Sequence, residues 1–477
     1  MTNLSRAALA SLPPAVLRPG HAPDVLGTGI VHFGPGAFHR AHQAAYVDRL
    51  LDRDPRWGIA AVSLRSGGTT DALKHQDRLY TLAILDREPS LRVIAAHSEA
   101  LGPGEGARLR TLLADPQVRI ATSTVTEKGY CLAADGSLDF GHADIVHDLA
   151  GASEPRSVIG WIVAGLAARR AAGVAPFAML CCDNMTGNGG KLRDACAAFA
   201  RNSDAGLADW IESEVAFPNS MVDSITPASD AAFLAKIRHD LGIDDAAAVQ
   251  REGFAQWVLQ RFDLPDGPDL AAAGVTLTGD VRGYEQAKLR ILNGAHSSLA
   301  YIGLALGLET VFEAMSDPAL EAFIHRLVHS DIALSLNPVE GLDVQHYATE
   351  VLNRFRNPAI RHLLSQIAWD GSQKLPYRLL DTIQDALDAG RSIDRLAVPI
   401  AAWIAFVRRK AQAQETITDP LAEVLARAAT GSDVATAMLD LRQIFPEQLA
   451  HDPRFRHAVA DALLQFLDGH VEALLAR

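Results

Sequence analysis

A polar stripe with residue types suited to proton transfer lies in the segment GYEQAKLRILNGAHSSLAYIG (283–303). At about 100° per residue, an α-helix places Glu285 and His296 within about 80° of Lys288, and Asn293 at about 140°. A solvated amphipathic face would give the same pattern. Leucines interleaved among these side chains favour instead a half-buried polar row, which needs hydrogen-bond partners or a ligand.

One lysine beside two neutral donors suits the interconversion of an alcohol and a ketone. A lysine shielded from water loses proton affinity and can act as a general base near neutral pH. Asn293 and His296 would hold the oxygen atom that gains or loses negative charge. The hydride would pass to or from a nicotinamide dinucleotide, and this scheme needs no metal ion.

A glycine-containing turn offers a place for that dinucleotide. In GTGIVHFGPGAFHRAHQ (27–43), Gly34 and Gly36 follow a β-branched run and precede a helical pattern. In a dinucleotide-binding fold the first glycine makes the tight turn and the second lets the backbone approach the pyrophosphate, while the helix supplies free N–H groups. The third position of the G-x-G-x-x-G pattern is His39 here.

The polar residues after this turn allow three interpretations. His39, Arg40 and His42 can be solvated residues of a first helical turn. Alternatively, Arg40 lies near phosphate while His39 packs under the turn. His39 and His42 could also form a metal-binding pair, because residues three apart share a helix face, although no acidic third ligand accompanies them nearby.

The end of the second predicted strand bears on the choice of cofactor. An acidic residue normally stands there and holds the ribose hydroxyls of NAD. Here the run WGIAAVSL (57–64) leads into Arg65 and Ser66 with no carboxylate, and these two residues could accept the 2′-phosphate of NADP. We therefore expect NAD as the cofactor without excluding NADP.

The wider pattern places these residues on an α/β domain followed by helices. Apolar β-rich runs alternate with helix-patterned segments such as HRAHQAAYVDRLLD (39–52), which indicates a mostly parallel sheet covered on both faces. The runs 79–85 and 91–96 could instead form a hairpin insertion. From about residue 284 the chain is almost continuously helical. The predicted strands are residues 29–33, 57–64, 79–85, 91–96, 118–125 and 177–182.

We therefore predict two domains. A Rossmann-type doubly wound dinucleotide-binding domain would cover residues 1–283. A mostly α-helical domain for substrate binding and catalysis would cover residues 284–477. The length of 477 residues agrees with two domains, since it exceeds what one hydrophobic core usually organises.

Composition excludes several classes of protein. With 48% hydrophobic and 21% charged residues the chain is an ordinary globular one, and its net charge of −13 argues against general nucleic-acid binding. No uncharged apolar run of about 20 residues and no signal peptide are evident, so we expect a cytoplasmic protein without a membrane span. The cysteines lack the Cys-x-x-Cys spacing of zinc sites, which favours buried free thiols. They are Cys131, Cys181, Cys182 and Cys196.

Taken together, these motifs resemble the polyol-specific long-chain dehydrogenases, a family that includes mannitol 2-dehydrogenase and fructuronate reductase (D-mannonate oxidoreductase). The resemblance runs over most of the chain, and six motifs in order are far more specific than any one of them. Its Lys-x4-Asn-x2-His signature is intact as Lys288, Asn293 and His296. The motifs are GPGAFHRAHQ (34–43), VTEKGY (125–130), CDNMTGNG (182–189), FPNSMVDSITP (217–227), KLRILNGAHSSLAYIG (288–303) and DGSQKLP (370–376).

The resemblance implies a role for each matched residue, in a site between the two domains. Lys288 would be the general base, with Glu285 on its proton path to solvent. Asn293 and Asn184 would contact the oxyanion, and His296 would bind substrate hydroxyls. Substrate contacts would include Asp223 and Lys374. Cofactor contacts would come from Phe33, Gly34, Pro35, Gly36, Ala37, Phe38, His39, Arg40, Thr126 and Glu127.

Three of these positions have simpler interpretations. Without the family, Asn184 reads as a turn asparagine after the last predicted strand. Asp223 could be a helix cap before Ile225. Lys374 could be an exposed loop charge.

The motifs divide on the substrate. QIAWDGSQKLPYRLL, with Gln366 where mannitol dehydrogenases tend to have arginine, resembles the fructuronate reductase branch, whereas FPNSMVDSITP resembles the mannitol branch. We favour D-mannonate/D-fructuronate, because Lys374 and Arg378 could bind a substrate carboxylate. D-mannitol/D-fructose is the alternative, and a non-catalytic dinucleotide-binding sensor is a remote one. We expect a monomer acting on a small molecule, with no nucleic-acid or membrane partner.

Overall fold

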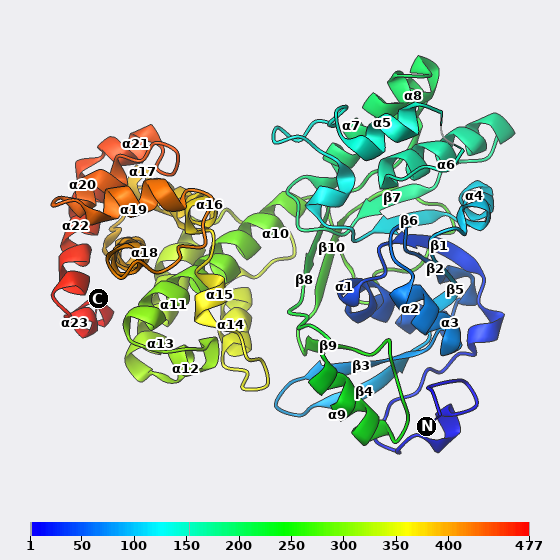
Figure 1. The fold of residues 1–477 in the computed structure, drawn as a ribbon, viewed down its shortest axis with the longest axis horizontal. Helices are drawn as coiled ribbons and strands as arrows, with labels where there is room; N and C mark the ends of the chain where they lie inside the picture. The colour runs from blue at the N-terminus through cyan, green and yellow to red at the C-terminus, as the bar shows by residue number, and fades with distance from the viewer. Residues whose placement is uncertain (1, 152, 477) are drawn as a thin grey trace. The chain divides into compact units, whose positions relative to one another are not determined.

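The computed structural model describes residues 2–151 and 153–476, and the chain divides into two compact units between Arg282 and Gly283 (Figure 1). Unit 1 is built on a five-stranded sheet with the strand order β5-β2-β1-β6-β7, and every strand pairing in it is parallel. This confirms the predicted Rossmann-type sheet. Its strands are β1 (Thr28–Phe33), β2 (Gly58–Val62), β5 (His97–Leu101), β6 (Ile120–Ser123) and β7 (Ala178–Cys181).

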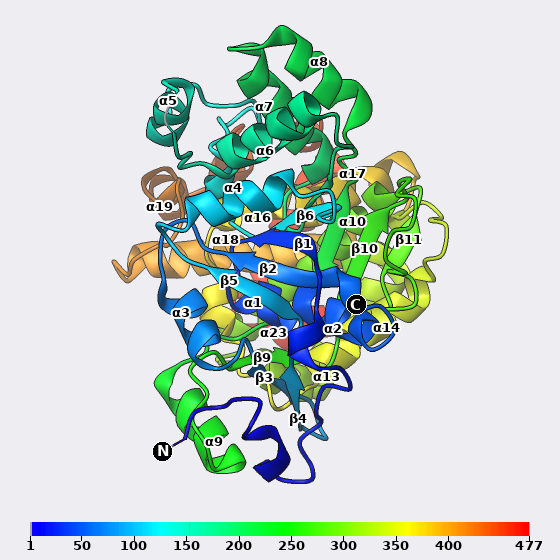
Figure 2. The same cartoon turned by 90° about the vertical axis from the view of Figure 1, so that its right-hand side faces the viewer.

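Alternating side chains of these strands feed two hydrophobic cores, one on each face of the sheet. In β1, Val31 and Phe33 join one core, whereas Ile30 joins the other. Figure 2 shows α4 and α6 on one side of the sheet and α1, α2 and α3 on the other. Cys181 and Cys182 likewise lie in opposite cores, and all four cysteines are buried free thiols, as predicted.

Two three-stranded sheets accompany the main sheet. One has the order β4-β3-β9, and its antiparallel β3–β4 pair is the hairpin that the sequence allowed. The other has the order β11-β10-β8. Their strands are β3 (Tyr80–Leu85), β4 (Ser90–Ile94), β8 (Ser220–Asp223), β9 (Val249–Glu252), β10 (Gln256–Gln260) and β11 (Thr276–Thr278).

The helix after the glycine turn is broken, unlike the single helix that the sequence predicts. His42 adopts φ −119° and ψ −88°, which ends α1 (Ala37–Ala41) before α2 (Gln43–Leu51) begins. The other α-helices of unit 1 are α3 (Gly68–His75), α4 (Gly106–Ala114), α5 (Ala143–Leu149), α6 (Val158–Ala172), α7 (Asn188–Arg201), α8 (Ala205–Glu214) and α9 (Ala231–Leu241). Short 3-10 turns are η1 (Leu9–Ser11), η2 (Pro23–Val25), η3 (Pro55–Trp57) and η4 (Glu127–Tyr130).

Unit 2 is helical, with no strand among its described residues 283–476. Its centre is α11, in which every residue from Gly294 to Gly303 is buried, as in a helix surrounded by others. The α-helices of this part of the chain are α10 (Val281–Ala287), α11 (Gly294–Ala305), α12 (Val311–Ser316), α13 (Pro318–Arg326), α14 (Val344–Phe355), α15 (Leu364–Ile367), α16 (Gly371–Leu375), α17 (Asp381–Asp388), α18 (Asp394–Gln412), α19 (Ala422–Thr430), α20 (Val434–Leu439), α21 (Glu447–His451), α22 (Pro453–Leu467) and α23 (Val471–Leu475).

Three segments of unit 2 are π-helical, and η7 (Ala333–Ser335) is a 3-10 turn. The π-helices are η5 (Lys288–Asn293), η6 (Leu327–Ile332) and η8 (Pro376–Leu380), and η5 packs against both of the others. Such turns are rare and occur frequently at functional sites. No helix within residues 2–151 and 153–476 combines the length and apolarity needed to cross a membrane.

Candidate active site

The turn after β1 lies where the strand order of the main sheet reverses. β1 pairs with β2 on one side and with β6 on the other, and doubly wound sheets bind ligands at the carboxyl ends of the strands at this point. Gly34 has φ +86°, and an added Cβ would lie 2.3 Å from the carbonyl oxygen of Thr124. Only glycine therefore fits at this position.

Gly36 has open space where a side chain would project. The atom nearest to an added Cβ is the carbonyl oxygen of Gly34 at 3.9 Å, so no neighbour in the protein requires glycine here. Gly36 is the N-cap of α1, and no side chain caps the first amides of that helix. An open backbone of this kind is the cradle that a pyrophosphate needs. The residues of the turn therefore fit a dinucleotide.

His39 and Arg40 turn inward from α1. The His39 ring stacks on His32 with centroids 3.4 Å apart, and its Nε2 lies 3.1 Å from Nε2 of His97. Arg40 is 7% exposed and donates a hydrogen bond to the carbonyl oxygen of Pro35 at 3.0 Å. Burial lowers the pKa of both side chains. They brace the turn from the interior, so the interpretation as solvated residues is wrong.

His39 and His42 do not converge on one point. Nε2 of His42 lies 2.8 Å from the carbonyl oxygen of Gln256, whereas Nε2 of His39 faces His97. Because the two histidines contact different partners, the structure disfavours the metal-binding pair of His39 and His42 that the sequence allowed. Figure 1 shows α1, which carries His39, beside the strands of unit 1.

The loop after β6 contains a strained residue. Thr126 has φ +66° and ψ +159°, a region that only glycine adopts readily. The carboxylate of Asp183 accepts hydrogen bonds from the amides of Val125 (2.9 Å) and Thr126 (3.0 Å) and from the Tyr130 hydroxyl (2.6 Å). Burial raises the pKa of Asp183, and these bonds oppose that shift. Glu127 begins η4 immediately after this strained residue.

A carboxylate from a distant part of the sequence lies near the end of β2, where the residues directly after the strand, Arg65 and Ser66, offer none. Asp144 at the start of α5 forms an ion pair with Arg65 at 2.8 Å. The guanidinium is 73% exposed and its charge is already partnered, which weakens the argument that it binds a 2′-phosphate. A cavity of about 500 Å³ includes both residues and the ends of β2 and β5 in its lining.

Two further predicted residues of unit 1 follow other strands. Asn184 is exposed in the loop between β7 and α7. Asp223 is the last residue of β8, is 6% exposed and pairs in register with Gln256 of β10. Interpretation of Asp223 as a helix cap is wrong, because the next helix, α9, begins only at Ala231.

In unit 2 the Lys-x4-Asn-x2-His signature lies on η5 and the first turn of α11. The prediction of a uniform α-helix is wrong here, and the difference matters for geometry. In a π-helix the hydrogen bonds join residues five apart, so Lys288 and Asn293 become neighbours on one face, as residues four apart are in an α-helix. Lys288, Asn293 and Glu285 on α10 are all half-buried.

His296 lies deeper than the rest of the signature. It is 8% exposed, its ring stacks on Phe355 at 4.3 Å, and the ring of His362 meets it edge-on at 5.1 Å. Burial, followed by the charges of His362, Arg354 and Arg378, lowers its pKa well below the usual value. His296 is therefore a neutral hydrogen-bonding group at neutral pH, and its buried Nε2 has no partner among the described residues.

Arg378 on η8 reaches the same region of unit 2. Its Nη1 donates to Ser297 Oγ at 3.0 Å and to the carbonyl oxygen of Asn293 at 3.5 Å. No carboxylate within the described residues pairs with this guanidinium, and burial lowers its pKa. Lys374 on α16 is half-buried, not an exposed loop charge, and donates to the carbonyl oxygen of Ile367 at 3.5 Å. Burial and then the charge of Arg378 lower the pKa of Lys374.

Comparison with known proteins assigns the family. The model of the mannitol dehydrogenase Rossmann domain matches residues 28–270, and that of the mannitol dehydrogenase C-terminal domain matches residues 280–467. The chain belongs to the mannitol dehydrogenase family. It is thus an oxidoreductase of that family, as the sequence motifs indicate.

Several known oxidoreductases are similar to the chain along almost its whole length. The D-mannonate oxidoreductase of Escherichia coli (strain K12) is 40% identical over 466 residues, which cover 95% of this chain and 96% of the relative. The Pseudomonas fluorescens mannitol 2-dehydrogenase, solved with NAD and D-mannitol, is 36% identical with a TM-score of 0.81, covering 100% and 99% of the two chains. A substrate-free D-sorbitol dehydrogenase is 31% identical with a TM-score of 0.93, covering 99% and 100%.

Three carboxylates that bind residues near the predicted site were not singled out from the sequence. Asp183 lies within the motif CDNMTGNG directly after a strand, so its position offered a signal. Asp144 and Asp419 offered none, because their partners are distant in sequence. Asp419 accepts hydrogen bonds from the amide (2.8 Å) and hydroxyl (2.5 Å) of Ser372, on α16, the helix that carries Lys374.

Proposed function

We propose that this protein is an NAD-dependent oxidoreductase that interconverts a secondary alcohol and a ketone at C2 of a linear sugar acid, D-mannonate/D-fructuronate. Family membership supports the reaction class. The 40% identity to a D-mannonate oxidoreductase supports the substrate. The observation that carries the substrate class is Arg378, a half-buried cation without a carboxylate partner among the described residues.

The dinucleotide would be held by the turn after β1 and the loop after β6. The backbone at Gly34 and Gly36 would lie against the pyrophosphate, together with the uncapped amides of α1. Thr126 and Glu127 would contact the same ligand across the switch point. When bound, the nicotinamide ring accepts or delivers the hydride. The similar mannitol 2-dehydrogenase was solved as a complex with NAD, which supports this choice of cofactor.

Lys288 would remove the proton from the C2 hydroxyl in oxidation and return it in reduction. A half-buried amine is suited to this role, because partial loss of hydration favours its neutral form. Asn293, its neighbour on η5, and Asn184 would donate to the oxygen as negative charge develops. Glu285 would pass the proton between Lys288 and solvent. Neutral His296 would bind substrate hydroxyls through its unpartnered Nε2.

Arg378 would bind the substrate carboxylate, with Lys374 and Asp223 as further substrate contacts. The guanidinium has only neutral acceptors, Ser297 and the Asn293 carbonyl, so an incoming anion would satisfy its charge. The bond to the Asn293 carbonyl would also fix the carboxylate relative to the residue that contacts the reacting oxygen. A polyol would leave this half-buried charge unmatched.

The substrate is tested with the purified protein, D-mannonate, D-mannitol and both NAD and NADP. We expect D-mannonate with NAD to give the highest kcat/KM. Arg378→Gln should lower kcat/KM for D-mannonate by about 10- to 100-fold, the value of a lost charge-assisted hydrogen bond, and should change that for D-mannitol by less than about threefold. The exposed Arg427→Gln is the control and should change neither value.

D-mannitol/D-fructose remains the second candidate, because the FPNSMVDSITP motif and the mannitol 2-dehydrogenase structure at 36% identity favour it. A kcat/KM for D-mannitol that exceeds that for D-mannonate by orders of magnitude would reject the sugar acid. Equal effects of Arg378→Gln on both substrates would reject the carboxylate contact while leaving the reaction class intact.

A further inference from the structure

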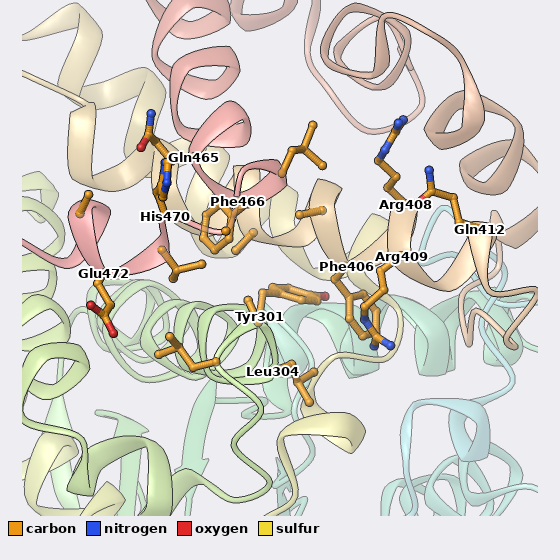
Figure 3. Close-up of a pocket in the computed structure, with 18 residues that line it drawn as sticks. Tyr301, Leu304, Phe406, Arg408, Arg409, Gln412, Gln465, Phe466, His470 and Glu472 are labelled. Atoms are coloured by element: carbon orange, nitrogen blue, oxygen red, sulfur yellow. The ribbon is translucent and has the colours of Figure 1, made fainter.

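A groove with a volume of about 800 Å³ lies in unit 2 at the end of α11 remote from the signature residues. It is formed by the carboxyl end of α11, the carboxyl-terminal half of α18, the end of α22 and the start of α23. Figure 3 shows Tyr301 at its centre, with Phe406 and Arg409 on one side and His470 and Glu472 on the other. Along α11, Leu304 in the groove is about 12 Å from His296. The residues that line the groove include none of the proposed active-site residues.

The floor of the groove is aromatic and aliphatic. The rings of Tyr301 and Phe406 lie 5.6 Å apart, and Phe466 and Leu304 face the same space (Figure 3). Leu467 on the rim is 45% exposed. An apolar lining of this kind gives an apolar molecule a surface on which to leave water.

One end of the groove is positively charged. Arg408 donates through Nη1 to the carbonyl oxygens of Ala429 (3.1 Å) and Gly431 (3.3 Å), and it has no carboxylate partner among the described residues. Arg409 and Lys410 share a single carboxylate, Glu415, at 3.5 and 3.2 Å. Arg408 and Arg409 line this end of the groove, and the Lys410 amine lies 5.6 Å from the centre of the Phe406 ring, so three cations face the single carboxylate of Glu415 here. The carboxylate of Glu472 lies on the opposite side of the groove (Figure 3).

We propose that this groove is a second ligand site, for a small amphipathic anion: an aromatic or acyl group that carries a carboxylate or sulfonate. The apolar part would lie on Leu304, Phe406 and Phe466, which are half-buried, above the buried ring of Tyr301, and the anionic group would face Arg408. The volume lies within the usual range of about 300–1,000 Å³ for small-molecule sites.

The site is tested by fluorescence titration with anilinonaphthalene sulfonate, a fluorescent aromatic anion, in the presence of saturating NADH to fill the dinucleotide site. We expect one saturable site on the folded protein. Ala305→Trp, at an exposed position on the rim, should abolish binding by filling the groove. Arg408→Gln should weaken binding about tenfold, while Arg427→Gln, an exposed arginine on α19 outside the groove, should leave it unchanged.

A second probe isolates the charge. N-phenylnaphthylamine has nearly the same ring system without the sulfonate, so it should bind more weakly than the anion and should be insensitive to Arg408→Gln. Thermal unfolding checks that each variant is folded. If Arg408→Gln is unstable, the Ala305→Trp variant and the comparison of the two probes on the wild-type protein still test the proposal. Binding that survives Ala305→Trp, or equal affinity for the charged and neutral probes, would overturn the proposal. Activity towards sugar acids is independent of either result.

Discussion

Lys288 is the residue on which the proposed proton transfer depends. Lys288→Ala should lower kcat by about 10²–10⁴-fold, the usual contribution of a general base, because no other amine on η5 can take the proton. The dissociation constant for NADH, followed by its fluorescence, should change by less than about twofold. Added methylamine should restore part of the lost rate.

Lys236→Ala provides the matched control, since this lysine is 69% exposed on α9 and pairs with Asp240 on the same helix. It should leave kcat unchanged. A Lys288→Ala protein that retains kcat within a factor of ten at neutral pH would exclude Lys288 as the base and would require another proton acceptor.

At the residue scale, the sequence shows which residue types are present and how they are spaced, but not which side chains surround them. The types and order of Lys288, Asn293 and His296 were readable because a spacing pattern is local. The partners of His296 were not, since Phe355 and His362 come from other parts of unit 2. Nor could the sequence reveal that Asp144 pairs with Arg65 across 79 positions.

At the scale of elements, apolar runs predicted most of the parallel strands, because strands that are buried on both faces of a sheet are short continuous apolar segments. β5 escaped notice since it follows β4 after two residues and its sequence, HSEAL, is polar. The π-helices were not predicted, because a helical pattern of apolar residues indicates that a helix is present but does not indicate the hydrogen-bond register, that is, whether the hydrogen bonds join residues four or five apart. That register depends on packing, as at Gly294, where an added Cβ would lie 2.9 Å from the carbonyl oxygen of Arg378.

Gly294→Ala should therefore disturb the contact between the start of α11, directly after η5, and η8. We expect a loss of stability of about 1–3 kcal/mol from overpacking, with a fall in kcat/KM because Arg378 and Asn293 move together. Gly190→Ala on α7 is the matched control. Nothing lies within 4 Å of its added Cβ, so it should stabilise the protein by about 0.5–1 kcal/mol. Thermal unfolding and steady-state kinetics distinguish the two, and equal effects would show that the crossing tolerates a methyl group.

At the scale of the whole molecule, buried histidines couple stability to pH. Burial lowers the pKa of His97 to about 3, and the charges of His32, Arg40 and Arg78 act in the same direction. Below pH 6.5, His97 binds a proton in the unfolded chain but stays neutral in the folded chain. The contribution of His97 to the free energy of unfolding is therefore fully present above pH 6.5 and is lost as the pH falls towards 3.

His97→Gln tests this coupling. Between pH 6.5 and 5 the wild-type protein should lose about 2 kcal/mol more free energy of unfolding than the variant, from about 1.4 kcal/mol per pH unit. Buried Asp48 and Asp245, whose pKa values are raised by burial, act in the opposite sense but are common to both proteins. Urea unfolding at several pH values measures the difference, and parallel pH profiles would exclude His97 as its source.

All four thiols lie in unit 1, and none lies in unit 2. Burial raises the pKa of Cys131 to about 11 and that of Cys181 to about 12, so the reactive thiolate is scarce while the unit stays closed. Alkylation by iodoacetamide consequently requires transient opening of unit 1, so the alkylation rate reports the opening of this unit and not that of unit 2. Bound dinucleotide should lower the alkylation rate because it stabilises the folded form of unit 1. The rate therefore measures cofactor binding without substrate or turnover.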